Sequence, residues 1–165
     1  MSLNRARIVD AVERSPGIHL RALQRVVGLS FTTVRYHISN LANAGEIECS
    51  VVGRYTRVFP RGFPESERSL ASILLGGSSR RVLKEVFEAK VASNKEISIA
   101  TGLAESTVSK HMRRLLSLGI VSRTGPFEGR PGYAMKDPGR VTRLVRAGSV
   151  QLERASERYV ELWDF

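Results

Sequence analysis

The sequence predicts a mainly α-helical protein with small β-hairpins, built from two tandem copies of one domain and a C-terminal helix. Three observations predict this fold class. Residues 28–47 are similar to residues 102–121, and the longer segments that contain them, 1–62 and 79–137, carry equal positive charge. Each segment also shows three helical patterns followed by two β-prone runs. Self-similarity at a fixed offset is the sequence signature of a repeated structural unit.

The repeat is visible at a constant offset of 74 residues, and it preserves both apolar and glycine positions. Within twenty aligned positions, seven residues are identical at that offset. The identical pairs are Gly28/Gly102, Leu29/Leu103, Thr33/Thr107, Val34/Val108, His37/His111, Leu41/Leu115 and Gly45/Gly119. This many identities at one offset indicate two copies of one fold.

The net charge of +10, from 26 Lys and Arg against 16 Asp and Glu, follows the repeat. Residues 1–62 and residues 79–137 each carry +5, whereas 63–78 carries −1 and 138–165 carries +1. We therefore expect domain 1 at 1–62, a linker with a short helix at 63–78, domain 2 at 79–137 and a terminal helix within 138–165. A strongly basic protein attracts polyanions, and nucleic acid is the first candidate.

Several classes of protein are excluded by composition. The longest apolar run has three residues, which is too short for a membrane span or a signal peptide. The single cysteine, Cys49, rules out a disulfide framework within the chain, and we expect it to be a buried structural thiol. No cluster suggests a metal, no motif suggests a cofactor, and no nucleophile and base are paired. We expect a non-enzymatic protein of the cytoplasm, associated with the nucleoid.

The first copy reads as three helices and a hairpin. An apolar face over 4–14 predicts a helix that Ser15-Pro16-Gly17 ends. A short helix follows over 20–27 and ends at Gly28. Ser30 is a good N-cap for a third helix that runs to Gly45. The β-prone runs 46–52 and 55–59, on either side of Gly53-Arg54, predict a hairpin.

The second copy repeats this order. Helices are expected over 81–89, 95–101 and 104–118, and strands over 121–124 and 133–135. Because Ala104 has no side-chain acceptor, the third helix of this copy begins without a side-chain cap. The eight residues between the two strands, rich in Gly and Pro, predict a longer and stiffer hairpin tip than in the first copy.

Two further helices are expected outside the repeat. Residues 65–75 form a short helix that we expect to pack between the domains, and residues 76–79 break the chain after it. Residues 140–163 carry apolar side chains at alternating spacings of four and three, as in a coiled-coil seam. This terminal helix either folds back on its own domains or forms a homodimer, and the spacing alone favours neither.

The segments 28–41 and 102–115, each followed by a Gly turn and a hairpin, resemble the winged helix-turn-helix of ArsR- and MarR-like regulators. The tandem arrangement is similar to that of archaeal-type transcriptional regulators with two such domains in one chain. The resemblance covers residues 4–136. It implies two tandem winged helix-turn-helix domains that bind double-stranded DNA through their third helices and wings.

The third helices have one apolar and one polar face. At 100° per residue, Val34, Ile38 and Leu41 form one buried stripe, and Val108, Met112 and Leu115 form the other. The opposite faces carry hydroxyl, amide and basic groups without a carboxylate, which suits base edges and phosphates in a major groove. His37 and His111 fall at the border of the stripes, where we expect packing rather than metal binding. The candidate DNA-binding residues of domain 1 are Thr32, Thr33, Arg35, Tyr36, Ser39, Asn40 and Asn43 on the helix and Arg54, Tyr55 and Arg57 in the wing. Those of domain 2 are Ser106, Thr107, Ser109, Lys110, Arg113 and Arg114 on the helix and Arg130 in the wing.

These features favour a sequence-specific, double-stranded DNA-binding transcriptional regulator with two unlike half-sites. The alternative is a non-specific architectural or single-strand/RNA-binding protein, in which wing aromatics stack on bases. A third class, a protein-interaction module, is disfavoured because its third-helix faces are expected to be neutral or acidic.

Overall fold

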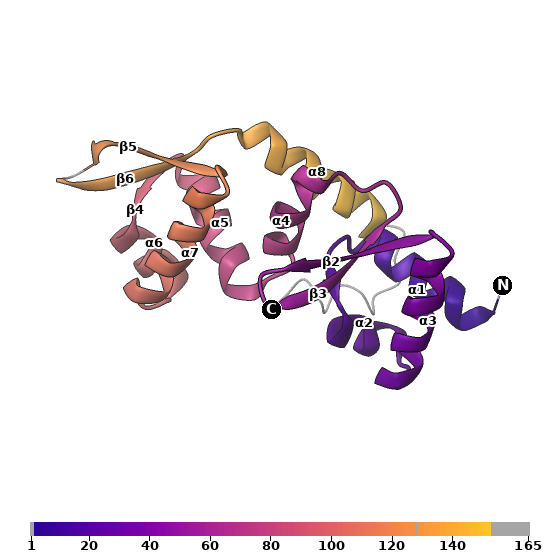
Figure 1. The fold of residues 1–165 in the computed structure, drawn as a ribbon. Coiled ribbons are helices and arrows are strands. Elements are labelled where there is room, and N and C mark those ends of the chain that lie inside the picture. Colours follow the sequence, from indigo (N-terminus) through magenta and orange to yellow (C-terminus); the bar gives the residue numbers. More distant parts are fainter. Residues whose placement is uncertain (1, 128, 153–165) are drawn as a thin grey trace. The chain divides into compact units, whose positions relative to one another are not determined.

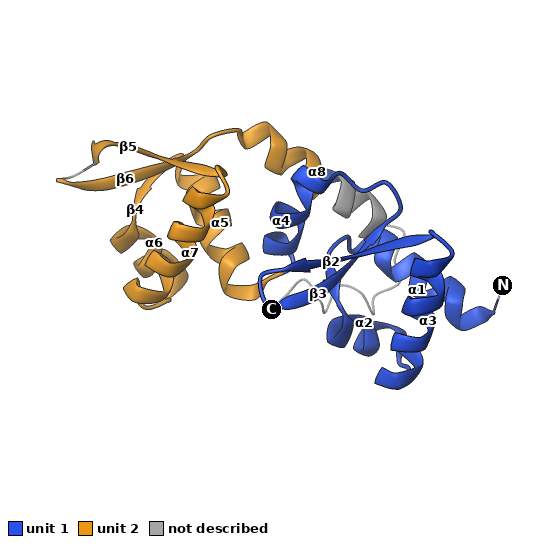
Figure 2. Cartoon of the chain, in the orientation of Figure 1, with its two compact units in different colours: residues 1–75, 146–165 blue, residues 76–145 orange. Residues whose placement is uncertain are grey.

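The computed structural model describes residues 2–127 and 129–152, and its chain is drawn as a ribbon in Figure 1. The chain divides into two compact units, coloured separately in Figure 2. Unit 1 comprises residues 1–75 together with 146–165, and unit 2 comprises residues 76–145. Helices predominate, and each unit contains one small antiparallel sheet. The predicted fold class, mainly α with small β wings, is therefore confirmed.

Within residues 2–75, unit 1 contains three helices, a three-stranded sheet and the linker helix. In chain order these are α1 (Leu3–Arg14), β1 (Ile18–His19), α2 (Leu20–Val27), α3 (Phe31–Asn43), β2 (Ile47–Val52), β3 (Tyr55–Pro60) and α4 (Glu65–Leu74). The strand order is β1-β3-β2, and both pairings are antiparallel. The three expected helices and the hairpin are present within one or two residues of their predicted bounds.

Strand β1 was not predicted, because two residues are too short for a periodic pattern. Ile18 pairs with Val58, and His19 pairs with Arg57. Ile18 is only 4% exposed. Burial in the core, and not the strand propensity of the segment, therefore fixes it beside the hairpin.

The predicted apolar stripe of α3 is buried. Val34 and Leu41 are fully inaccessible and Ile38 is 6% exposed. They pack in one hydrophobic core with residues of α1, α2 and the sheet. The stripe therefore fixes which face of α3 remains outside.

The turn between α2 and α3 also forms as the sequence indicates. Gly28 ends α2 in the left-handed region, at φ 64°, which glycine adopts without the steric cost of a Cβ. The hydroxyl of Ser30 accepts a hydrogen bond from the backbone N–H of Thr33 at 3.1 Å and caps α3. Together they set the short connection between the two helices.

The linker helix α4 belongs to unit 1 and covers the face of the sheet that carries Phe59. The Phe59 and Phe63 rings stack with centroids 5.3 Å apart. The Arg68 guanidinium lies 5.1 Å from the centre of the Phe59 ring and also pairs with Glu48. These contacts fix α4 to the first domain, since aromatic stacking and a cation over a ring both favour this packing.

Unit 2 repeats the same order of elements. These are α5 (Gly77–Ala89), β4 (Val91–Ser93), α6 (Asn94–Thr101), α7 (Glu105–Ser117), β5 (Val121–Phe127), β6 (Arg130–Met135) and the start of α8 (Pro138–Leu152). Its sheet has the order β4-β6-β5, so β4 is the counterpart of β1. The predicted stripe of α7 is buried: Val108, Met112 and Leu115 are each at most 1% exposed.

Two predictions for unit 2 were wrong. The break expected over residues 76–79 is shorter and lies at Leu75 and Gly76, because α4 ends at Leu74 and α5 already begins at Gly77 with Gly76 as its N-cap. The second hairpin has no eight-residue tip, because its strands pair as far as Phe127 and Arg130. The pairing register shifts between Arg123 and Pro126, so the ladder accommodates the Gly and Pro residues by an irregularity instead of ending.

Cys49 is exposed, so the expectation of a buried thiol was wrong. It lies on β2 two residues beyond the buried Ile47, and Val51, two residues further on, is 73% exposed. The hairpin extends past the helices that cover its base, and the apolar alternation along β2 therefore continues into solvent.

The terminal helix α8 is described only to Leu152, so the predicted segment 140–163 lies partly outside the described residues. Val141 is 6% exposed, whereas Val145, one turn later, is 48% exposed. The apolar seam and the homodimer stay predictions.

Candidate nucleic-acid interface

The outer face of α3 is exposed and polar, opposite the buried stripe. Tyr36 at its centre is 65% exposed, and its ring meets that of His37 edge to face at 5.5 Å. The candidate residues of α3 that the structure leaves exposed are Thr32, Arg35, Tyr36, Ser39, Asn40 and Asn43. This face offers hydroxyl, amide and guanidinium groups to a partner.

Thr33 and Thr107 differ from the other candidates because both are partly buried at the start of their helices. The Thr33 hydroxyl lies 2.7 Å from that of Ser30, within the α3 cap. The backbone N–H of Thr107 donates to the carbonyl of Ala104 at 2.9 Å. Both residues thus help to begin a helix.

The outer face of α7 is more basic. Ser106, Lys110, Arg113 and Arg114 are exposed, whereas Ser109 is partly buried. The Ser109 hydroxyl accepts a hydrogen bond from Asn94 Nδ2 at 3.1 Å, so it joins α7 to the start of α6. Three adjacent cations on one helix face attract phosphates more strongly than the single Arg35 of α3.

A carboxylate lies on α7, next to the face that the sequence predicts to be free of carboxylates. Glu105 is the first residue of α7 and is exposed. An acid in the first turn is favoured by the helix dipole, and it partly compensates for the missing side-chain cap at Ala104. Glu105 precedes Val108 of the buried stripe by three residues and therefore lies outside the face opposite that stripe.

The candidates in the first wing have unlike surroundings. Arg54 and Tyr55 are exposed, and Tyr55 is accessible over 61% of its surface. Arg57 is partly buried, and its Nη1 donates to the carbonyl of Gly17 at 2.7 Å. The Arg57 guanidinium is thus engaged within unit 1 and supports the approach of β1 to the wing.

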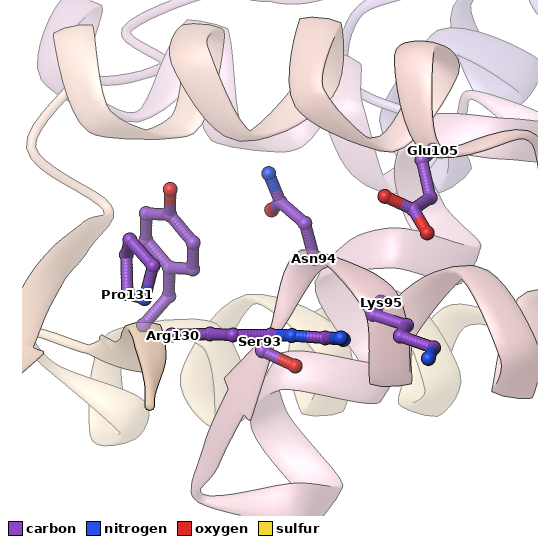
Figure 3. Close-up of a pocket in the computed structure, with 7 residues that line it drawn as sticks. Ser93, Asn94, Lys95, Glu105, Arg130 and Pro131 are labelled. Atoms are coloured by element: carbon purple, nitrogen blue, oxygen red, sulfur yellow. The ribbon is translucent and has the colours of Figure 1, made fainter. Parts of the chain in front are cut away.

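Arg130, the candidate in the second wing, lines a cavity of about 400 Å³ (Figure 3). The cavity lies where the start of α6, the start of α7 and strand β6 meet. Its walls are formed by Ser93, Asn94, Lys95, Glu105, Arg130, Pro131 and Tyr133. Of these, only Arg130 is among the DNA-binding candidates predicted from the sequence.

Lys95 is a functional candidate that sequence reasoning missed, as is Arg21, which occupies the same position in the first copy. Each is the second residue of its short helix, and both are exposed. The signal was present in the repeat, because a basic residue recurs at the constant offset beside the third helix.

Positive charge and burial lower the pKa of two histidines near these surfaces. The pKa of His19 lies below 6.5 mainly because of burial, and Arg57, Arg25 and Arg21 lower it further. Burial likewise lowers the pKa of His111, with added effects from Lys110 and Arg114. Both imidazoles are therefore neutral at pH 7. His37 and His111 are partly buried, as expected at the border of the stripes.

Among residues 2–127 and 129–152, no three His, Cys, Asp or Glu side chains gather as a metal site would require. In the same part of the chain, none of the helices combines the length and the apolar character that a membrane crossing needs.

Fold and surface together define a tandem winged helix-turn-helix protein, with a third helix and a wing exposed in each domain. Comparison with known families agrees with this class. Residues 2–70 match a family model described as an N-terminal HTH domain. Residues 77–122 match one described as winged helix-turn-helix DNA-binding. The chain therefore carries two helix-turn-helix domains, and the family model that matches the second is of a DNA-binding type.

No curated protein matches the chain. Among solved structures, the chain is similar to ScpB from Mycobacterium tuberculosis at 16% identity and a TM-score of 0.36. That match covers 87% of this chain and 98% of the other.

Proposed function

We propose that the protein is a sequence-specific, double-stranded DNA-binding transcriptional regulator that uses a recognition helix and a wing in each of two domains. One observation carries the proposal: α3 and α7 both follow a tight Gly-Leu turn and both expose a polar or basic face opposite a buried stripe. A helix held in this way can enter a major groove with its polar face toward the base edges. In this proposal the protein is an ArsR/MarR-like regulator of the archaeal type, in agreement with its tandem domains.

The two recognition surfaces supply different parts of the binding free energy. The α7 surface carries Lys110, Arg113 and Arg114, which suit phosphate contacts and hence salt-dependent affinity. The α3 surface carries Tyr36 and Asn40 among its polar groups, which suit hydrogen bonds to bases. The proposed target therefore has two unlike half-sites, even for a single chain.

Selection from a random duplex library tests the proposal directly. We expect an asymmetric consensus with two separated half-sites. Recovery of sequences without a consensus would contradict sequence specificity, and a perfect palindrome bound by one chain would contradict the unlike half-sites.

Charge reversal then tests the surface. The variant Lys110→Glu/Arg113→Glu/Arg114→Glu should abolish duplex binding, because three attractive contacts become repulsive. A matched comparison sets Lys110→Glu against Lys84→Glu, since Lys84 is also exposed but lies on α5. Equal loss from both single variants would show that only the net charge matters.

Two exposed rings in unit 1 favour a second candidate function, binding of single strands or RNA. Tyr36 and Tyr55 are 65% and 61% exposed, and exposed aromatic rings can stack on unpaired bases. Competition between duplex and single-stranded oligonucleotides of one sequence at fixed salt separates the two functions. Preference for the duplex supports the regulator, and preference for the single strand supports the alternative.

Dimerisation through residues 140–163 would give the regulator a two-fold axis. Light scattering of the full chain and of a chain ending at Leu152 tests this, since the shorter chain retains the buried Val141. A dimer mass that falls to a monomer mass in the shorter chain supports the dimer, and equal monomer masses rule it out.

A further inference from the structure

The two units have the same backbone arrangement but different side chains at the junction between the wing and the second helix. In both units a short strand pairs with the wing and leads directly into the second helix, so sheet register identifies equivalent residues. The next wing position on the same face lies two residues earlier along β3 or β6. The equivalent pairs are His19/Ser93, Arg57/Gly132 and Tyr55/Arg130.

In unit 1 aromatic rings occupy this junction. The rings of His19 and Tyr55 lie 6.1 Å apart between centroids. His19 Nδ1 also accepts a hydrogen bond from the backbone N–H of Ala22 at 3.2 Å and thereby caps α2. The imidazole is neutral at pH 7, so this pair of rings offers no charge to an anion.

In unit 2 the same junction is open and carries two cations. Ser93, which replaces the larger His19, has a small side chain, and a cavity of about 400 Å³ lies beside it among β6, α6 and α7 (Figure 3). Arg130 reaches it from the wing and Lys95 from α6. Both are exposed, and neither forms an ion pair within the residues that the structure describes.

Two carboxylates lie near these cations, but they leave the cations available. Glu96 accepts hydrogen bonds from the N–H and the hydroxyl of Ser93 at 2.7 and 2.8 Å, in a capping box. Those hydrogen bonds, and to a smaller extent Arg130, hold the Glu96 pKa below its usual value. Glu105 lies on the α7 side of the cavity, at the first residue of that helix.

The position of the cavity identifies the group that reaches it. A recognition helix in the major groove and a wing at the adjacent minor groove lie on either side of one sugar-phosphate strand. This strand must pass between α7 and β6, which are two of the walls of the cavity. We propose that the cavity of unit 2 binds one phosphodiester group of that strand, with Arg130 and Lys95 as its cationic contacts.

This proposal rests on the proposed function and adds an asymmetry to it. Unit 1 also has a cation at the position of Lys95, Arg21, but its wing carries Tyr55 where unit 2 carries Arg130, so we expect unit 2 to hold the DNA strand between helix and wing more tightly. Asn94 acts as a positioning residue, because its hydrogen bond to Ser109 fixes the start of α6 against the recognition helix.

The salt dependence of duplex binding tests the phosphate site, with a selected duplex as the probe. The variant Lys95→Gln/Arg130→Gln should reduce the slope of log affinity against log salt by about 0.9 for the lost phosphate. Affinity should fall about five- to tenfold near 0.15 M salt, with the selected consensus unchanged. The matched variant Arg21→Gln/Tyr55→Gln, at the equivalent positions of unit 1, should change the slope by less than half as much.

Three results would overturn the phosphate site: an unchanged slope in the unit 2 variant, equal changes in both variants, or a changed consensus. Thermal melting of both variants controls for folding, because Lys95 and Arg130 are exposed and their loss should leave the midpoint unchanged. A duplex series with single methylphosphonate linkages adds a second readout. One neutral linkage beside the unit 2 half-site should weaken the wild type and leave the double variant unaffected.

Two further results distinguish free phosphate from a DNA phosphate as the ligand, and failure of the phosphate site from failure of the proposed function. If inorganic phosphate at millimolar concentration displaces the duplex from the wild type but not from the double variant, the site prefers free phosphate and the strand assignment is wrong. If the wild type binds no duplex at all, the proposed function itself fails.

Discussion

The two recognition helices share their buried stripe and differ in what they expose. Val34 and Leu41 in α3 correspond to Val108 and Leu115 in α7, and all four are buried. The outer face changes from hydroxyl, amide and aromatic groups to a cluster of cations. Packing tolerates few changes on the buried side of each helix. The fold therefore constrains that side and leaves the exposed side free to diverge.

The largest expected effect tests the shared side. Leu41→Ala and Leu115→Ala should each lower the free energy of unfolding by about 2–5 kcal/mol, because each removes a buried side chain and leaves a cavity. Denaturant unfolding measures both. A loss below 1 kcal/mol in either variant would contradict an equivalent packing role, and Ser39→Ala on the exposed face is the control.

A smaller effect is expected from the first residue of each recognition helix, where an aromatic side chain in one helix corresponds to a carboxylate in the other. Phe31 is 37% exposed and Glu105 is exposed. Phenylalanine suits the thymine methyl group, and glutamate accepts from the cytosine amino group, so the half-sites should prefer T and C at the equivalent position. Each preference is worth about 1–3 kcal/mol.

Exchange of these two residues should exchange the preferred bases in a repeated library selection. If the selected DNA consensus is unchanged after the two residues are exchanged, Phe31 and Glu105 act only in helix initiation. Thermal melting of the exchanged protein distinguishes a change of specificity from a loss of folding.

The helix caps give the next contrast. Ser30 caps α3 through its hydroxyl, whereas Ala104 makes no side-chain hydrogen bond at the start of α7. Ser30→Ala should cost about 1 kcal/mol of unfolding free energy, and Ala104→Ser should add about 0.5–1 kcal/mol. Chemical denaturation measures the change in unfolding free energy of each variant. Changes of the same sign in both variants would contradict the difference between the two caps.

The smallest expected effect is the pH dependence of stability that His19 contributes at the junction of unit 1. Because the pKa of His19 is lowered from 6.5 in the folded state, the unfolded chain binds a proton more readily. The associated stability is present above pH 6.5 and decreases as the pH falls below it. His19→Ser, which places the residue of the equivalent Ser93 there, should reduce this dependence. Melting curves from pH 7.5 to pH 5 measure it, and an unchanged slope in the variant would contradict the role of His19.

The parts of the fold that depend on local pattern were predicted from the sequence. Helix periodicity located α3 and α7, and the repeat supported each with the other. Short strands such as β1 depend on tertiary pairing, which no pattern of two residues reveals. The prediction of a long hairpin tip around Pro126 was wrong, because an irregular strand ladder can also accommodate turn-forming residues.

The sequence predicted which helix faces are exposed, but not the contacts that the candidate side chains make. Exposure of the residues opposite each stripe follows from helical geometry, so Tyr36 and Lys110 are where the sequence placed them. The engagement of Arg57 by the Gly17 carbonyl depends on residues 40 positions apart. The cavity beside Arg130 likewise needs three separate elements to meet, and composition carries no trace of it.

The exposed position of Cys49 has a practical consequence for every experiment above. It is the sequence's single cysteine and lies on the first wing, so a thiol-reactive fluorophore would label that wing at one defined site without any substitution. Burial of part of the residue raises the pKa of the thiol, so labelling should proceed faster as the pH is raised above neutrality. The chain thus offers one native attachment point for an optical reporter of contacts made by the first domain.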